Sequence, residues 1–275
     1  MTNAGMAEYW NHQGGPQWIR EQDRYDAMLK PMGRRLLDTA AITEGERVLD
    51  VGCGGGATTL EAAERVGPDG RAVGLDLSEP MLATARSRAG GATATFVLGD
   101  AQTERIEGPF DVVISRFGVM FFDDPVAAFT NLAGALRPGG RMCFVCWQEM
   151  LNNEWIRVPI MAIAGHVGIP EPPAPGEPGP FSLADPDRIQ HILDQAGLSD
   201  VTVEEAAEPM ALGRDPADVI DFMITDGMAR RLVEGKDTGL IARGAQSARE
   251  ALEPYASADG VRLGSAYWVV TARKA

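Results

Sequence analysis

The 275-residue sequence has only three cysteines and no long uninterrupted apolar run. So few cysteines exclude a disulfide framework and fit a reducing compartment. Every apolar stretch is too short to span a bilayer, and residues 1–8 lack the basic start and apolar run of a signal peptide. We therefore expect a cytoplasmic protein with no membrane contact.

Positive charge is also scarce, with 25 lysines and arginines against 39 acidic residues and a net charge of −14. Nucleic acid binding needs a basic face, and no cluster of Lys and Arg is visible. A small-molecule partner is therefore favoured over nucleic acid. The length favours one α/β core with insertions over two independent domains.

A glycine-rich segment at residues 48–56, VLDVGCGGG, is the most informative stretch. The apolar residues 47–51 predict a buried strand, and residues 57–66 predict a helix. Glycine at 52, 54 and 56 permits positive φ and a close approach of the backbone to a ligand. The spacing of Gly52, Gly54 and Ala57 also fits the dinucleotide fingerprint, so the glycines alone leave the cofactor open.

Asp50 distinguishes a dinucleotide from a cofactor that has no phosphate. A carboxylate two residues before the first glycine would repel the pyrophosphate of a dinucleotide. S-adenosylmethionine (SAM) has no phosphate, and its ammonium and sulfonium groups favour a nearby carboxylate. The alternative is that Asp50 only accepts hydrogen bonds from the amides of its own turn.

Four more strands are predicted at residues 71–75, 94–98, 110–115 and 141–147, alternating with helices. This rhythm predicts a parallel sheet covered on both faces. Asp76 ends the second strand, 24 positions after Gly52, where a carboxylate can accept from ribose hydroxyls. Asp100 follows the third strand and could accept from an adenine amino group, or serve only as a turn residue.

The chain resembles the class I SAM-dependent methyltransferases, of the group that includes the ubiquinone and menaquinone C-methyltransferases. Five segments carry the resemblance at the family's order and spacing: residues 48–56, GLDLS at 74–78, GDA at 99–101, FDVV at 110–113 and LRPGGR at 136–141. They lie within residues 45–148. The resemblance implies a Rossmann-like, seven-stranded, mostly parallel sheet with helices on both faces, whose last strand is antiparallel.

The resemblance also assigns SAM-binding roles. Asp50, Gly52, Cys53 and Gly54 would lie near the methionyl group, Asp76 on the ribose, Leu77 and Met81 beside the adenine, Asp100 and Ala101 on its edge, and Ser115, Arg116 and Phe117 near the transferred methyl.

The chain is expected to divide into an N-terminal helical arm or lid at residues 1–44, a core at 45–205 and 264–275, and a helical cap at 206–263 between strands six and seven. Residues 201–205 and 266–273 are the candidates for those two strands. A substrate-side loop insertion is expected at 150–184, with six prolines between residues 170 and 180.

The acceptor site is predicted less specifically. Trp10 and His12, in a polar and glycine-rich stretch before the arm helix, are the preferred lid contacts, with Trp147 and His166 as further candidates. No metal site is expected, because Cys143 and Cys146, three residues apart in a strand, point to opposite faces. The three histidines, His12, His166 and His191, belong to no catalytic motif, so no base is assigned.

These patterns predict an enzyme that moves a methyl group from SAM to a small organic metabolite by direct in-line displacement. Oxygen, nitrogen, sulfur and carbon acceptors stay open, and a homo-oligomer is possible. Two alternatives remain: a SAM-binding protein of the same fold with a regulatory or non-methylating role, and an NAD(P)-dependent oxidoreductase.

Overall fold

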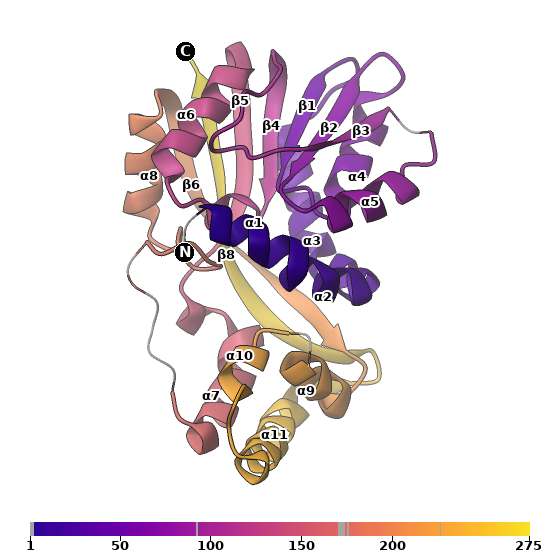
Figure 1. The fold of residues 1–275 in the computed structure, drawn as a ribbon, viewed down its shortest axis with the longest axis vertical. Coiled ribbons are helices and arrows are strands. Elements are labelled where there is room, and N and C mark those ends of the chain that lie inside the picture. The colour runs from indigo at the N-terminus through magenta and orange to yellow at the C-terminus, as the bar shows by residue number, and fades with distance from the viewer. Residues whose placement is uncertain (1–2, 92, 170–173, 175, 226) are drawn as a thin grey trace.

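The computed structural model describes residues 3–91, 93–169, 174, 176–225 and 227–275. Its strands form one sheet in the order β3-β2-β1-β4-β5-β8-β6, with the short β7 beside β8 (Figure 1). The strands are β1 (Arg47–Val51), β2 (Arg71–Asp76), β3 (Ala94–Leu98), β4 (Phe110–Arg116), β5 (Leu136–Trp147), β6 (Leu198–Gly213), β7 (Ala256–Ser257) and β8 (Gly260–Lys274).

The first five strands are parallel, and β8 runs antiparallel between β5 and β6. This arrangement confirms the predicted mostly parallel sheet with an antiparallel last strand. The bounds of β1 and β3 agree with the sequence prediction residue by residue.

Helices cover both faces of the sheet. From β1 the chain crosses to β2 through α4 (Ala57–Val66) and then to β3 through α5 (Glu79–Arg88), whereas α6 (Pro125–Ala135) joins β4 to β5 in the opposite direction. Since such crossovers are right-handed, α6 lies on the face opposite α4 and α5. Asp124 caps α6 by accepting from the amide of Ala127, and Asp185 caps α8 (Pro186–Gln195), which contacts α6.

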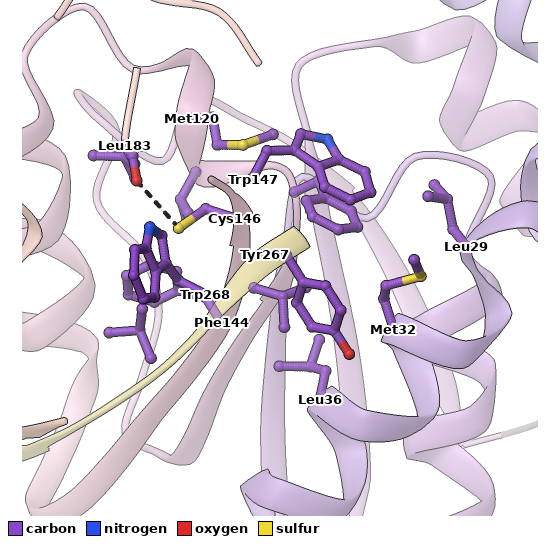
Figure 2. Packing of buried hydrophobic residues seen from close by; sticks show 14 of the residues in the cluster. Leu29, Met32, Leu36, Met120, Phe144, Cys146, Trp147, Leu183, Tyr267 and Trp268 are labelled. Atoms are coloured by element: carbon purple, nitrogen blue, oxygen red, sulfur yellow. Dashed lines mark hydrogen bonds between the residues drawn. The ribbon is translucent and has the colours of Figure 1, made fainter. Parts of the chain in front are cut away.

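The core lies between β5, β8 and the long arm helix α3 (Gln22–Ala40). Figure 2 shows Met32 and Leu36 of α3 next to Tyr267. It also shows Leu183 next to Cys146. The Cys146 thiol contacts the carbonyl of Leu183 at 3.6 Å, while Cys143 contacts the carbonyl of Leu36 at 3.7 Å. The two thiols therefore point to different packing partners, as the strand period predicts.

From Asn3 onward the N-terminal arm is largely helical, in α1 (Asn3–His12), α2 (Gly14–Arg20) and α3. The polar and glycine-rich stretch that holds Trp10 and His12 does precede the arm helix α3, and it is itself helical. Ala4, Met6, Ala7 and Glu8 are good helix formers, and they outweigh the polar neighbours.

The cap is built differently from the expected helical insertion at 206–263. Strands β6 and β8 continue past the core as a two-stranded antiparallel ribbon, pairing from Ala207 with Ala266 to Gly213 with Val261, and Figure 1 shows this ribbon reaching the cap helices. The helices of the cap are α9 (Pro216–Thr225), α10 (Arg230–Val233) and α11 (Thr238–Leu252), and α7 (Glu154–Val167) packs on α11.

Short 3-10 turns complete the structure at η1 (Val119–Phe121), η2 (Met150–Asn152) and η3 (Glu253–Tyr255). Part of the predicted proline-rich loop, residues 170–173 and 175, lies outside the described residues. No helix within the described ranges combines the length and the apolar character that crossing a membrane requires.

Candidate functional site

A cavity of about 900 Å³ lies at the carboxyl ends of the parallel strands, between the sheet, the arm and the cap. This is the edge where open α/β sheets bind ligands. Eleven of the twelve predicted SAM-binding residues line it: Asp50, Gly52, Cys53, Gly54, Asp76, Leu77, Met81, Asp100, Ala101, Arg116 and Phe117. Two of the four predicted acceptor contacts, Trp10 and Trp147, line it as well.

Three predicted site residues lie elsewhere. Ser115 is buried behind the cavity, where its hydroxyl donates to the carbonyl of Val51 at 2.7 Å and accepts from the amide of Gly118 at 3.2 Å. His12 borders a smaller pocket, which residues of α2 line together with Thr225 and Arg230 of the cap. His166 contacts the Ser247 hydroxyl of α11 at 2.9 Å. The structure therefore corrects the placement of these three side chains.

The glycine turn has the backbone conformation that its sequence predicts. Gly52, Gly54 and Gly56 have φ of +66°, +54° and +82°, a region that residues with a Cβ rarely adopt. A methyl group on Gly52 would also lie 2.7 Å from the Cα of Gly118. The turn thus leaves bare main chain against the cavity.

Asp76 ties this turn to the next helix. Its carboxylate accepts from the amide of Gly54 at 2.7 Å and from the amide of Ser78 at 2.9 Å. A carboxylate has about four acceptor positions, so Asp76 keeps capacity for the two hydroxyls of a ribose. Burial raises its pKa, while the backbone hydrogen bonds oppose that shift.

Asp100 has more local partners than the adenine-binding prediction required. Its carboxylate accepts from the amide of Gln102 at 2.8 Å, from the Thr103 hydroxyl at 2.7 Å and from the side chain of Asn3 in the arm. Asp100 is therefore a turn residue that also faces the cavity.

Asp50 is a buried carboxyl group of the site. Only 1% of it is exposed, and burial raises its pKa to about 7, although the Thr59 hydroxyl, 2.6 Å away, and the positive charge of Arg116 oppose the shift. The alternative interpretation was that Asp50 only accepts hydrogen bonds from the amides of its own turn. Among the described residues its hydrogen-bond partner is instead the side chain of Thr59 in α4.

The electrostatic character of this end of the cavity follows from these groups. Asp50, Asp76 and Asp100 all line it, and burial followed by the charges of Asp76 and Asp50 also raises the pKa of the Cys53 thiol. Such a site favours a cationic ligand and opposes a pyrophosphate.

Aromatic side chains form the neighbouring wall. Phe117, held at a φ of +63°, stacks on Trp147 with ring centroids 3.9 Å apart and planes at 12°. Trp155 lies 5.3 Å from Trp147. These rings give this wall of the cavity an apolar surface.

The arm and the cap meet over the cavity. Trp18 stacks on Tyr25 at 3.8 Å, and Tyr25 contacts Phe222 of α9 edge-to-face at 5.5 Å. Arg24 lies over Phe222, 4.1 Å from the ring centre, and donates to the carbonyl of Leu212 at 2.8 and 3.0 Å. The cap is therefore part of the cavity wall and not a separate unit.

The sequence did not identify several lining residues. Gln22 lies beside Gly55, with its side-chain oxygen buried and without a hydrogen-bond partner among the described residues. Phe121, Phe222, Arg230 and Arg231 also face the cavity. None belongs to a recognisable motif; only the proximity of Phe121 to the fourth strand could have pointed to it.

Comparison with known proteins supports the same assignment. Residues 48–140 match the model of a methyltransferase domain. The chain is 41% identical over 118 residues to aklanonic acid methyltransferase DauC of Streptomyces sp. (strain C5), covering 42% of this chain and 54% of that protein. It is 44% identical over 126 residues to nocamycin O-methyltransferase of Saccharothrix syringae, covering 43% of this chain and 45% of that protein. The chain thus spans about half the length of these relatives.

Among solved structures, the fold resembles a Haemonchus contortus phosphoethanolamine N-methyltransferase 2 in complex with SAM. The TM-score is 0.54 at 21% identity, over 89% of this chain and 52% of that one. The matched segment and the sheet agree: residues 48–140 are similar to a methyltransferase domain, and the mostly parallel sheet has the fold of the solved methyltransferase structure.

Proposed function

We propose that the whole chain is a SAM-dependent methyltransferase that acts on a small organic acceptor and releases S-adenosylhomocysteine. The observation that carries this proposal is the acidic, glycine-lined end of the cavity. Three carboxylates line this end together with the glycine turn, where a Cβ on Gly52 or Gly54 would lie too close to neighbouring residues.

The residues present fit the cofactor's groups. Asp76 would hold the ribose, Asp100 and Ala101 would border the adenine, and Asp50 would face the cationic methionyl end. Bound SAM supplies an electrophilic methyl group on a sulfonium. The protein would orient the two reactants, while Phe117 and Trp147 keep water from the reacting centre.

The cavity also has room for an acceptor next to this cofactor site. Its far walls come from the arm and the cap and carry Trp18, Met210, Phe222 and Met223. These walls favour a largely apolar or aromatic small molecule. The names of the two curated relatives, an aklanonic acid methyltransferase and an O-methyltransferase, agree with an organic acceptor that offers oxygen.

The positions of the three histidines argue against a histidine as the catalytic base. His12, His166 and His191 all lie outside the cavity lining. We therefore propose that transfer proceeds without a histidine base, either from an acceptor that is already deprotonated or with proton loss to solvent.

The test is calorimetry with SAM, S-adenosylhomocysteine and NAD, followed by incubation of the protein with SAM and a panel of aromatic phenols and acids. We expect binding of the two SAM-type ligands, no binding of NAD and formation of S-adenosylhomocysteine with some acceptors. Binding of NAD without SAM would contradict the cofactor assignment. Binding of SAM with no product across the panel would favour the non-methylating role.

A further inference from the structure

The two ends of the cavity differ in charge. The sheet end carries Asp50, Asp76 and Asp100, whereas the cap end carries Arg230 and Arg231 of α10. In a chain with a net charge of −14, two adjacent arginines facing a cavity are an unusual local concentration of positive charge.

Neither arginine is neutralised by an ion pair with a described carboxylate. The acidic residues that border this end are Glu177 and Glu234. Glu234 is exposed and forms no ion pair with either arginine, and Glu177 accepts from the amide of Ala174 at 3.3 Å. Structural arginines elsewhere in the chain do have such partners, for example Arg88 with Asp26 at 2.7 Å.

A row of three aromatic rings in contact with one another begins at this end of the cavity. Phe121 follows β4 and contacts Trp10 at 5.3 Å; Trp10 contacts Tyr9 at 5.3 Å; and the guanidinium of Arg231 lies over the Tyr9 ring at 4.9 Å. All four residues line the cavity. A flat ligand that lies along these rings would bring one edge to the arginines.

We propose that the methyl acceptor is a flat aromatic molecule with a carboxylate, which Arg230 and Arg231 bind at the cap end. Guanidinium groups bind carboxylates through paired N–H donors, and the rings of Tyr9, Trp10 and Phe121 supply the apolar surface for the aromatic body. Arg231 on Tyr9 is held ready for this contact by its position over the ring.

This arrangement also separates the two ligands by charge. The cationic cofactor is favoured at the carboxylate end and an anionic acceptor at the arginine end, so each is repelled from the site of the other. The inference rests on the proposed function, because it concerns the acceptor of the same cavity.

The experiment measures the binding of 2-naphthoate and its neutral amide, 2-naphthamide, to the protein with saturating S-adenosylhomocysteine, by quenching of tryptophan fluorescence. We expect the carboxylate to bind about three- to thirtyfold more tightly than the amide, and the preference to decrease as salt increases. The double variant Arg230→Gln with Arg231→Gln should remove the preference and leave naphthamide binding unchanged.

The matched control is Arg243→Gln, on α11 and outside the cavity lining, which should keep the preference. Equal affinities for the two probes, no binding of either probe, or an equal loss for both in the double variant would overturn the proposal. Calorimetry with S-adenosylhomocysteine alone tests the proposed function separately. Failure there overturns both, whereas success there with equal probe affinities overturns the acceptor assignment alone.

Discussion

Replacing Asp50 with asparagine should make the protein more stable at alkaline pH. The pKa of the Asp50 carboxyl is raised from 3.8 to about 7 by burial, so the folded state retains its proton in a range where the unfolded chain has released it. Stability therefore falls as pH rises from about 4 to about 7 and is level above that.

The size of the effect follows from the shift. Each pKa unit corresponds to about 1.4 kcal/mol, so the ionised Asp50 costs about 4 kcal/mol at pH 8, and about 3 kcal/mol of this develops between pH 5 and pH 8. Asparagine keeps an oxygen for the Thr59 hydroxyl and carries no charge. The difference in unfolding free energy, variant minus wild type, should thus grow by about 3 kcal/mol over this range.

Urea unfolding of both proteins at pH 5, 6, 7 and 8 measures this difference. Titrating groups that do not interact with Asp50 cancel because both proteins contain them. A difference that stays constant within about 0.5 kcal/mol over the whole range would refute the account of a buried, uncompensated carboxyl group at the site.

The same carboxyl group should link cofactor binding to pH. A cationic ligand beside Asp50 favours its ionised form, so binding lowers its pKa and releases a proton. The affinity of the wild type for S-adenosylhomocysteine should rise with pH up to about 7, with proton release detected by calorimetry in two buffers of different ionisation enthalpy. Asp50→Asn should bind more weakly and release no such proton.

Three further changes test the supporting structure by thermal or urea unfolding. Gly52→Ala should cost more than Gly45→Ala, because both glycines have positive φ but only Gly52 would also meet the backbone of Gly118 at 2.7 Å; equal costs would contradict the close approach. Ser115→Ala should cost about 1–3 kcal/mol, because it leaves the buried carbonyl of Val51 without its donor; a neutral result would argue against that role. Arg24→Met should cost about 1–3 kcal/mol through the lost hydrogen bonds to Leu212 and should raise cap exchange rates with deuterium; unchanged exchange would show that the arm does not hold the cap.

The sequence predicted the parallel core closely because its signals there are local. Glycine and proline mark the turns, and buried parallel strands are continuous apolar runs, so β1, α4 and β3 have the expected bounds. Most of the residues expected to bind the cofactor line one cavity for the same reason, since they sit at the ends of these strands.

The long strands β6 and β8 were predicted too short because their stability comes from pairing with each other. Residues 204–209 contain glutamate, alanine and proline, which have low strand propensity, yet they pair with residues 264–269 of β8. Tertiary pairing overrides propensity in such a ribbon, and no local pattern announces it.

The acceptor end could not be predicted because it is assembled from distant segments. Tyr9, Phe121 and Arg231 come from the arm, the segment after β4 and the cap, and only the folded chain brings them to one wall. His166 illustrates the opposite error: a chemically suitable residue near the predicted loop insertion, whose ring faces α11.

The most direct test of the central claim is calorimetric titration of the wild-type chain and of Asp76→Ala with S-adenosylhomocysteine and with NAD. The account predicts that the wild type binds S-adenosylhomocysteine and not NAD, and that Asp76→Ala weakens this binding about tenfold or more, because the ribose loses a charged acceptor. Binding of NAD in place of S-adenosylhomocysteine, or an unchanged affinity in Asp76→Ala, would contradict it.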